Sequence, residues 1–450
     1  MDTYHDGFTE KYEKMTTSPV EKLVLRLAIP TVMTMLISAF YNMTDTFFVG
    51  SLGTSATAGV GVAFPLMTVI QAVGFFFGQG SGNCVARELG AMKTDNASKA
   101  AVTGFILCLA AGTIIGAAGL AVIDDMAVFL GATPTVLPYA RGYLFYILLG
   151  VPWMTTSLML NNLLRFQGGA FYAMIGMTSG AILNVVLDPI FIFVVKMGVP
   201  GAALATMISQ FVSFCLLLAG CSRGGNIRLR LRHFTPNRAT FKEIVRGGLP
   251  SLFRQSIASI AAICINNLAG DYGDAAIAAM SIVSRVTLIA NSVLFGVGQG
   301  FQPVCGFNYG AKLYGRVKRS FWFCVKLFTA LMVMATVAAW IWAPDVIAVF
   351  RSDDEEVIAI GSLALRLQFA TSILMGWVII NNMMLQTMGK SVSASTLALA
   401  RQGLFLLPIL FALTKYFGLL GIQMSQPIAD VASFILSVPF NIHAMREMKS

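Results

Sequence analysis

The sequence predicts an all-α integral membrane protein with twelve transmembrane helices, in two six-helix bundles related by pseudo-two-fold symmetry along the membrane normal. Three observations lead to this fold class. Of the 450 residues, 56% are hydrophobic and only 12% are charged, far more apolar than a soluble chain of this length requires. Apolar runs of about 20 residues recur along the chain. The second half also repeats the first at a fixed offset.

Each apolar run is long enough to cross a bilayer as a helix. The runs lack the alternation of polar and apolar residues that is typical of membrane β-strands, so a helical bundle is favoured over a barrel. In chain order, the expected spans are 23–49, 56–79, 97–123, 136–161, 170–195, 199–221, 244–268, 275–299, 318–342, 357–385, 394–416 and 418–440.

Lysine and arginine are concentrated in every second segment between the spans. Counted from the amino terminus, alternate segments hold 22 of the 31 Lys and Arg residues, whereas the opposite loops hold only Arg141, Lys196, Arg351 and Lys415. Because positively charged loops stay in the cytoplasm, both termini are expected there, which agrees with an even number of spans. The net charge of +10 then reflects topology and attraction to membrane lipids, and no nucleic-acid partner is expected.

The two halves of the chain match when one is shifted by 220 residues, in one unbroken register across six helices. The matched positions include Pro30 and Pro250, Gly78-Gln79-Gly80 and Gly298-Gln299-Gly300, Gly90 and Gly310, Asn161-Asn162 and Asn381-Asn382, and Gly198 and Gly418. Because six is even, both halves enter the membrane in the same direction. Two facing bundles enclose a cavity that can open to either side, as is typical of alternating-access transporters.

This repeat divides the chain into five parts. They are a cytoplasmic amino-terminal segment (1–22), a first bundle (23–221), a basic cytoplasmic linker (222–243), a second bundle (244–440) and a cytoplasmic tail (441–450). The seven cysteines show no C-x-x-C spacing and the three histidines are scattered, so neither disulfides nor a structural metal site is expected. No Ser, Cys and His constellation indicates an enzyme, and a receptor is equally disfavoured.

Three of the 21 acidic residues fall within spans, namely Asp45, Asp188 and Asp430. An acid at a helix centre costs about 2.5 to 3.5 kcal/mol on insertion scales, so each requires a reason. Asp45, in FYNMTDTFFVG, and Asp188, in NVVLDPIF, both lie toward the outer side of outward-running helices. Asn184 precedes Asp188 by four residues and therefore shares its helix face. Thr206 and Tyr143, on inward-running helices, reach a similar depth.

Two neighbouring carboxylates in a poorly hydrated site cannot both ionise cheaply, so this group of side chains is a candidate proton-coupling site. Two other interpretations stay open. Asp45 could cap a helix at the interface, and carboxylate, amide and hydroxyl oxygens are also ligands for Na⁺, which would bind at Asp45, Asn184, Asp188 and Thr206.

Asp430 has a different setting, because the second half carries arginines within its spans. An ion pair with Arg285 or Arg401 is the simpler interpretation, and a role as a second coupling acid is the alternative. The positions that match Asp45 and Asp188 hold Ile265 and Pro408, neither of which ionises. The coupling chemistry is therefore expected to be asymmetric between the two halves.

These motifs together resemble the multidrug and toxic compound extrusion (MATE) family, in its DinF-like branch. The resemblance rests on the repeat, FYNMTDTFFVG, a GQG turn after the second helix, and NVVLDPIFIF followed by GVPGAALAT, and it covers about residues 20 to 445. It implies export of amphipathic, often cationic drugs or metabolites, driven by inward movement of H⁺ or Na⁺. It also implies a monomer without a cofactor in a bacterial or archaeal cell membrane.

The resemblance carries roles onto individual residues. The cation-coupling site falls on Asp45, Tyr143, Asn184, Asp188 and Thr206, the substrate cavity on Tyr41, Asn161 and Asn381, and a bending point of the first helix on Pro30. The alternative function is a flippase for lipid-linked oligosaccharide or lipid. Such a flippase would hold phosphate through basic residues such as Arg254, Arg285, Arg366 and Arg401.

Overall fold

The structure is a computed structural model that describes residues 2–351 and 354–448. For residues 2–7, 39, 41–43, 45 and 46 only the backbone is described. Two expected site residues, Tyr41 and Asp45, therefore have side chains that lie outside the described part of the chain.

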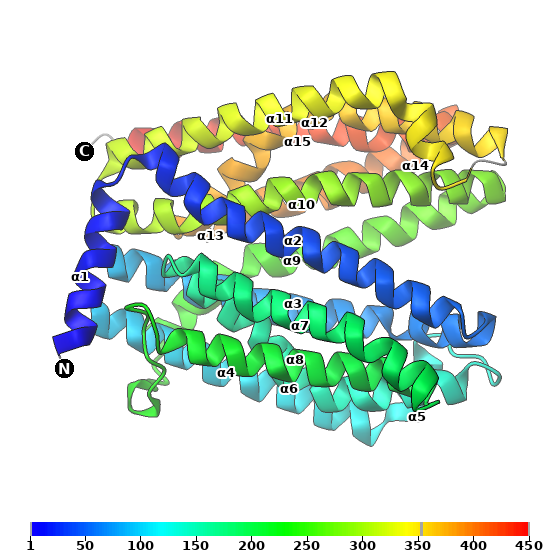
Figure 1. Ribbon diagram of the computed structural model, residues 1–450. Coiled ribbons are helices and arrows are strands. Elements are labelled where there is room, and N and C mark those ends of the chain that lie inside the picture. The colour runs from blue at the N-terminus through cyan, green and yellow to red at the C-terminus, as the bar shows by residue number, and fades with distance from the viewer. Residues whose placement is uncertain (1, 352–353, 449–450) are drawn as a thin grey trace.

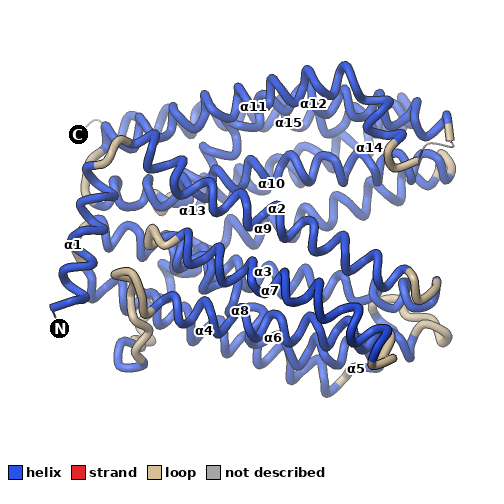
Figure 2. The backbone as a smooth tube through the Cα atoms, viewed as in Figure 1, coloured by secondary structure: helices blue, strands red, loops and turns tan. Residues whose placement is uncertain are grey.

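Helices make up nearly all of the described chain, and no strand occurs in it (Figure 2). In order, they are α1 (Asp2–Thr17), α2 (Val20–Gly50), α3 (Thr54–Gly90), α4 (Thr94–Ala121), α5 (Ile123–Phe129), α6 (Leu137–Phe166), α7 (Ala170–Pro189), η1 (Ile190–Val194), α8 (Val199–Cys221), η2 (Leu231–His233), α9 (Arg238–Gly270), α10 (Asp274–Gly310), α11 (Tyr314–Ala348), α12 (Glu355–Thr387), α13 (Ser391–Leu399), η3 (Ala400–Phe405), α14 (Leu406–Phe417) and α15 (Leu419–Glu447).

The predicted membrane fold is confirmed. Among the described residues, eleven helical segments are long and apolar enough to cross a membrane, and each coincides with an expected span. The remaining expected span, 23–49, lies in α2, a helix of 31 residues. Two spans continue through a π-helical turn, α7 into η1 and α13 through η3 into α14.

The helices form two groups that face each other (Figure 1). We call α2 to α8 the N-lobe and α9 to α15 the C-lobe. Between the lobes, α2 packs against α10 and α3 packs against α9. Both chain ends lie at one end of the bundle, which we call the terminal face, and the opposite end is the far face (Figure 1).

The repeat is visible in the backbone as matched residues with positive φ. At an offset of 220, Gly53 and Gly273 have φ of 108° and 97°, and Gly198 and Gly418 have φ of 62° and 60°. Gly168 and Gly389, with φ of 79° and 81°, match at an offset of 221 instead. The expectation of one unbroken register was therefore wrong. Compared with the first half, the second half has one more residue before Gly389 and one fewer between Gly389 and Gly418.

The GQG segment is not a turn, contrary to the expectation from the sequence. Gly78, Gln79 and Gly80 lie inside α3, which continues to Gly90. The glycines are needed for close packing: a Cβ at Gly80 would lie 2.2 Å from the carbonyl oxygen of Ile244 on α9. Small residues let helix backbones approach, so this motif marks a contact between the lobes rather than a chain reversal.

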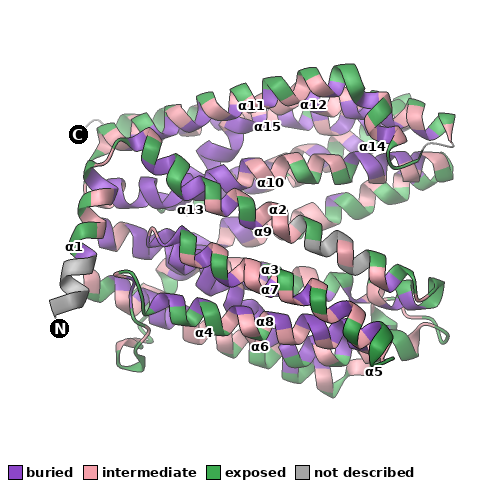
Figure 3. Cartoon of the chain, viewed as in Figure 1, coloured by how far each residue is buried: buried purple, intermediate pink, exposed green. Residues whose placement is uncertain are grey.

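The two lobes are packed most tightly near the terminal face. A Cβ at Gly90 would lie 2.1 Å from the Phe307 oxygen, and one at Gly310 would lie 2.1 Å from the Arg87 oxygen. Continuous buried runs occupy the parts of the helices that approach this face (Figure 3), at 78–86, 159–167, 296–308 and 378–388. A membrane helix that is buried all round is surrounded by protein, so the space between the lobes is closed at the terminal face.

Helix α1 lies across the terminal face (Figure 1) and joins the two lobes. On the C-lobe side, Asn308 Nδ2 donates to the Met15 carbonyl at 3.2 Å. On the N-lobe side, Lys11 Nζ donates to Asn226 Oδ1 and, at 3.5 Å, to the Gly224 carbonyl. The amino-terminal segment expected from the sequence therefore contains a helix, α1, that covers the closed end and contacts both sides of it. We call this helix the strap.

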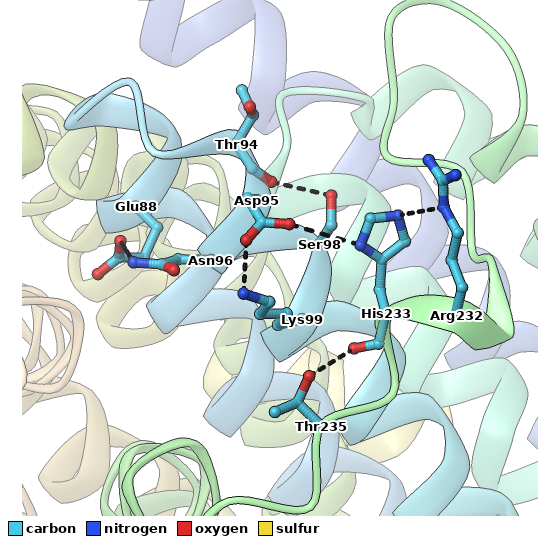
Figure 4. A network of polar contacts seen from close by, with 9 residues as sticks. All are labelled: Glu88, Thr94, Asp95, Asn96, Ser98, Lys99, Arg232, His233 and Thr235. Atoms are coloured by element: carbon cyan, nitrogen blue, oxygen red, sulfur yellow. Dashed lines mark hydrogen bonds and ion pairs between the residues drawn. The ribbon is translucent and has the colours of Figure 1, made fainter.

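The basic linker, residues 222–243, is held against the N-lobe by polar contacts. Ile227 N donates to Gln167 Oε1 at 2.6 Å, and His233 Nδ1 lies 3.6 Å from Asp95 Oδ1. Asp95 also binds Lys99 at 2.5 Å (Figure 4), and this hydrogen bond holds the pKa of the Asp95 carboxyl below its ordinary value. These contacts attach the linker to α4 and α6.

Candidate functional site

The clearest polar site in the N-lobe joins α7 to α8 through Asn184, Asp188 and Thr206. The first two residues lie one turn apart on α7 and share a face. With the Asn184 carboxamide oriented to satisfy its neighbours, Nδ2 donates to Asp188 Oδ2 at 3.0 Å. Its oxygen then accepts from both Oγ1 and the backbone N of Thr206, each at 3.2 Å. One amide thus links a carboxyl group on α7 to the backbone of α8.

These three side chains are cut off from solvent. Asp188 is 0% exposed, and Asn184 and Thr206 are each 1% exposed. A buried carboxylate is costly unless hydrogen bonds and nearby charges compensate it. The Asn184 amide supplies one such hydrogen bond, so its orientation depends on whether Asp188 carries a proton.

A proline shapes the backbone next to the carboxyl group. Pro189 has no N–H to donate, so the carbonyl four residues earlier lacks its usual helical donor. The chain continues as the π-helical turn η1, in which Val195 N donates to the Ile190 carbonyl at 2.8 Å. Such turns are frequent at functional sites.

Tyr143, the fourth described member of the expected coupling site, lies on α6 and is buried. It belongs to an apolar cluster with Ile192 of η1 and with Val199 and Ala203 at the start of α8. These residues flank Asp188 and Thr206 in sequence. The structure therefore places Tyr143 beside the elements that carry the site.

Asp45 lies on α2, which packs against α7. Since its side chain is outside the described part, as is that of Tyr41, their part in the site stays a prediction. The bending point Pro30 lies within α2, which runs unbroken through it.

The two asparagines expected in the substrate cavity lie at helix contacts. Asn161 Nδ2 donates to the Ala173 carbonyl on α7 at 3.2 Å, and Asn381 Nδ2 donates to the Ser437 carbonyl on α15 at 2.7 Å. Asn382, the residue after Asn381, lines a cavity between the lobes that is described below. It also repeats the Asn161 contact by donating to the Ala394 carbonyl, so Asn382, and not Asn381, is the structural equivalent of Asn161.

In the C-lobe, Asp430 is fully buried and pairs with Arg401. Arg401 Nε lies 2.9 Å from Asp430 Oδ1, and Gln426 Nε2 donates to the same oxygen at 2.8 Å. Arg285, the other expected partner, is exposed and forms no ion pair with a described residue. Asp430 therefore has a cationic partner, and the partner lies in the π-helical turn η3.

A cavity of about 380 Å³ lies between the lobes. The N-lobe contributes Met35, Gln71 and Phe75 to its wall, and the C-lobe contributes the remainder, from α9, α10, α12, α13 and η3. Gln299, in the second GQG segment, is among the lining residues. The cavity thus adjoins the glycine contacts that close the terminal face.

A buried polar chain, which the sequence analysis did not predict, crosses between the lobes. Gln302 Nε2 of the C-lobe donates to Gln79 Oε1 at 3.0 Å, and Gln79 Nε2 donates to Asn162 Oδ1 at 3.0 Å. Asn162 Oδ1 also accepts from Arg165, which had been counted as a loop charge but is only 1% exposed. Two of these residues belong to motifs that repeat in the sequence, Gln79 in the first Gly-Gln-Gly segment and Asn162 in the first Asn-Asn pair, whereas Gln302 lies outside the second Gly-Gln-Gly segment.

Within the described residues, no group of three or more His, Cys, Asp or Glu side chains is arranged to hold a metal ion. The ligand chemistry in the N-lobe site is instead one carboxyl group, one amide and one hydroxyl group.

Comparison with known proteins gives consistent results. The family model described as MatE matches residues 30–190 and 250–412. The multidrug export protein MepA of Staphylococcus haemolyticus strain JCSC1435 is 26% identical over 431 residues, which is 95% of this chain and 94% of that protein. MepA of Staphylococcus aureus strain MSSA476 is 26% identical over 92% of this chain and 91% of that one.

Solved structures also match over nearly the whole length. One is described as the outward-facing conformation of a multidrug resistance MATE family transporter of the MOP superfamily, with a TM-score of 0.91 and 27% identity over 97% of this chain and 98% of that chain. Another is a MOP superfamily transporter from Pyrococcus furiosus, described as having a binding pocket of reverse polarity, with the same score, identity and coverage.

Proposed function

Because the chain belongs to the MATE family of multi-pass membrane transporters, we propose that it exports amphipathic compounds in exchange for protons, with Asp188 as the residue that binds the proton. The proposal rests on one observation above all. A buried carboxyl group on α7 is tied to α8 through a single amide, so a proton there changes how two helices are joined. The MepA relatives, named for multidrug export, support small-molecule drugs or metabolites as substrates.

The hydrogen bonds suggest how a proton acts. When Asp188 is ionised, Asn184 Nδ2 donates to it and the amide oxygen accepts from Thr206. A protonated Asp188 donates instead, so the amide turns its oxygen toward Asp188 and its NH₂ group toward Thr206 N–H. The Thr206 hydroxyl can accept from the NH₂ group at 3.2 Å, but the Thr206 N–H then faces a donor, so one of the two bonds to α8 is lost and the link weakens. Asp45, on the helix that packs against α7, completes the proposed site together with Tyr143.

The closed terminal face supports a mechanism of alternating access. The distribution of Lys and Arg supports a cytoplasmic terminal face, with both termini inside the cell. The structure then has its lobes closed toward the cytoplasm. We propose that α2 bends near Pro30 when Asp188 is protonated, that substrate leaves outward, and that the lobes, 23–221 and 244–440, reorient as units. The linker 222–243 moves with the N-lobe, and one chain suffices as a monomer.

The driving force is adequate for export. One pH unit supplies about 1.4 kcal/mol per proton, and 100 mV supplies about 2.3 kcal/mol per charge. One or two protons can therefore sustain a substrate gradient of roughly tenfold to several hundredfold. Sodium is the alternative coupling ion, since carboxylate, amide and hydroxyl oxygens also bind it.

Ethidium uptake into everted membrane vesicles tests this function. The pH and the sodium gradient are varied independently at a fixed membrane potential. Wild type should accumulate ethidium with the pH gradient alone, whereas Asp188→Asn should lose this uptake because the site can no longer exchange a proton. Asp125→Asn, at an exposed acid on α5, is the matched control and should behave as wild type. Uptake that follows sodium and ignores pH would contradict proton coupling.

Flippase activity is the second candidate, because arginines line the central cavity. Movement of a lipid-linked oligosaccharide in the same vesicles, with no movement of ethidium, would favour it over drug export.

A further inference from the structure

The wall of the central cavity carries positive charge. Arg254 and Arg401 both line it, and no Asp or Glu is among its described lining residues. Asp430, the acid associated with this wall, is itself fully buried and bound to Arg401 Nε. The nearest charges that a bound molecule meets are therefore guanidinium groups.

Arg254 is the less neutralised of the two arginines. Its guanidinium lies over the Phe295 ring at 5.4 Å from the centroid, and Nη2 donates to Ser251 Oγ at 3.5 Å. No described carboxylate pairs with it. A guanidinium has five N–H donors in a planar fork, so this single long hydrogen bond leaves donors that suit a carboxylate, sulfonate or phosphate.

The remainder of the wall combines amides with apolar groups. Gln255, Asn291, Gln299 and Gln402 supply amides, and Met35, Phe75 and Leu288 supply apolar surface. Gln299 is 4% exposed, and its Oε1 has no hydrogen-bond partner in the described part of the chain. Both residues line the same cavity: the Arg254 guanidinium offers donors to an anion, and the Gln299 oxygen can accept from a donor group elsewhere on the same ligand.

We propose that this cavity is a substrate subsite that binds the anionic group of an amphipathic compound, with Arg254 as the anion-binding residue. The compounds it selects are zwitterionic or anionic amphiphiles, in which an apolar ring system lies against Phe75 and Met35. This inference rests on the proposed export function and changes its substrate class, since the family resemblance implied cationic compounds.

A matched pair of dyes separates the two classes. Tetramethylrhodamine has a free carboxylate, and its methyl ester has the same chromophore without that negative charge. Their binding to the purified full-length protein in phosphatidylcholine nanodiscs is measured by fluorescence anisotropy, with no ion gradient. The free acid should bind about tenfold more tightly or better, as expected from one charge-assisted hydrogen bond. Equal affinity, or tighter binding of the ester, would overturn the proposal.

Substitutions assign the preference to one side chain. Arg254→Gln should remove the preference for the free acid, and Arg254→Lys should retain part of it. Arg223→Gln, at an exposed arginine in the linker 222–243 and outside the described cavity lining, should leave it intact. Thermal unfolding of each variant shows whether it is folded, and an Arg254→Gln variant that folds and keeps the preference contradicts the assignment.

Three further results distinguish this subsite from the proposed coupling site and from a lipid-binding site. If Asp188→Asn keeps both the dye preference and proton-driven efflux, the coupling proposal fails and the subsite stands. If efflux depends on Asp188 but the two dyes bind equally, the subsite fails and the coupling stands. Displacement of the free acid by phosphatidylglycerol added to the nanodiscs would assign the anion site to a lipid headgroup and overturn the assignment to exported compounds.

Discussion

At the scale of single residues, two carboxyl groups among the described residues are fully buried, and their partners differ. Asp430 has the guanidinium of Arg401 beside it, which stabilises its charged form. Asp188 accepts from the neutral amide of Asn184. A carboxylate held by an arginine is suited to a fixed ion pair, whereas a hydrogen bond from an amide can reverse its direction when the carboxylate takes up a proton. This difference favours Asp188 as the titrating group.

Lys11 is a second residue whose surroundings control its charge. Its side chain is half-buried where α1 meets the linker, and desolvation lowers its pKa from 10.5 to about 7. With α1 undocked, the side chain would have its ordinary pKa. The undocked form therefore binds more protons between about pH 7 and pH 10.5, so docking strengthens as the pH rises through this window and is flat below it.

Hydrogen exchange of α1 measures this dependence. Protection factors in α1 should increase from pH 7 to pH 9, corresponding to at most about 1.4 kcal/mol per pH unit for one proton. Lys11→Met should remove the increase, because no proton is then exchanged, and Lys93→Met, at an exposed lysine, should leave it unchanged. Protection that falls over this range in the wild type would show that burial does not control the Lys11 charge.

At the scale of helices, glycines determine how closely the lobes approach. Gly80→Ala would place a methyl group 2.2 Å from a backbone carbonyl of α9, which cannot turn away. Overpacking costs about 1 to 3 kcal/mol, enough to shift the balance between closed and open terminal faces by roughly tenfold or more. The closed state described here should therefore be less populated in Gly80→Ala than in the wild type.

Gly61→Ala on the same helix is the control, since a Cβ there meets nothing within 4 Å. Hydrogen exchange in α3 and α9 near the terminal face should be faster in Gly80→Ala than in Gly61→Ala, and gradient-driven export should be slower. If the two variants exchange alike, the glycine contact does not hold the lobes together.

The helices were predictable from the sequence because each is a long apolar run, but their ends were not. Gly, Gln and Gly look like a turn until a partner helix is placed against them. The pairing of Asn184 with Asp188 followed from their spacing of four residues. In contrast, the contact between Gln79 and Gln302 joins residues 223 positions apart on different lobes, and periodicity within one helix cannot predict it.

The same limit explains the asparagines. Shifting the chain by 220 residues paired Asn161 with Asn381, whereas equivalent hydrogen bonds pair Asn161 with Asn382. One residue turns a side chain by about 100° around a helix, enough to move it from a cavity to a helix contact. Arg165 was misplaced for a related reason, because charge alone does not show that α6 continues, buried, through its position.

At the scale of the whole molecule, the lobes are closed at the terminal face while the cavity lies between them. The closure is distributed over glycine contacts, the strap α1 and the ion pair between Arg87 and Glu243 at 2.8 Å. The Asp188 site belongs to the N-lobe and lies apart from these contacts in sequence. Proton-coupled export therefore requires that a proton on α7 changes the way the N-lobe packs against the C-lobe.

The most direct test of this central claim compares two kinds of transport in one preparation of proteoliposomes. Counterflow, the exchange of labelled for unlabelled substrate without an ion gradient, requires binding and movement of the lobes. Uphill transport driven by a pH gradient also requires proton exchange. If Asp188 binds the coupling proton, Asp188→Asn should keep counterflow at a rate comparable to wild type and lose uphill transport. Uphill transport by Asp188→Asn at the wild-type rate would contradict it.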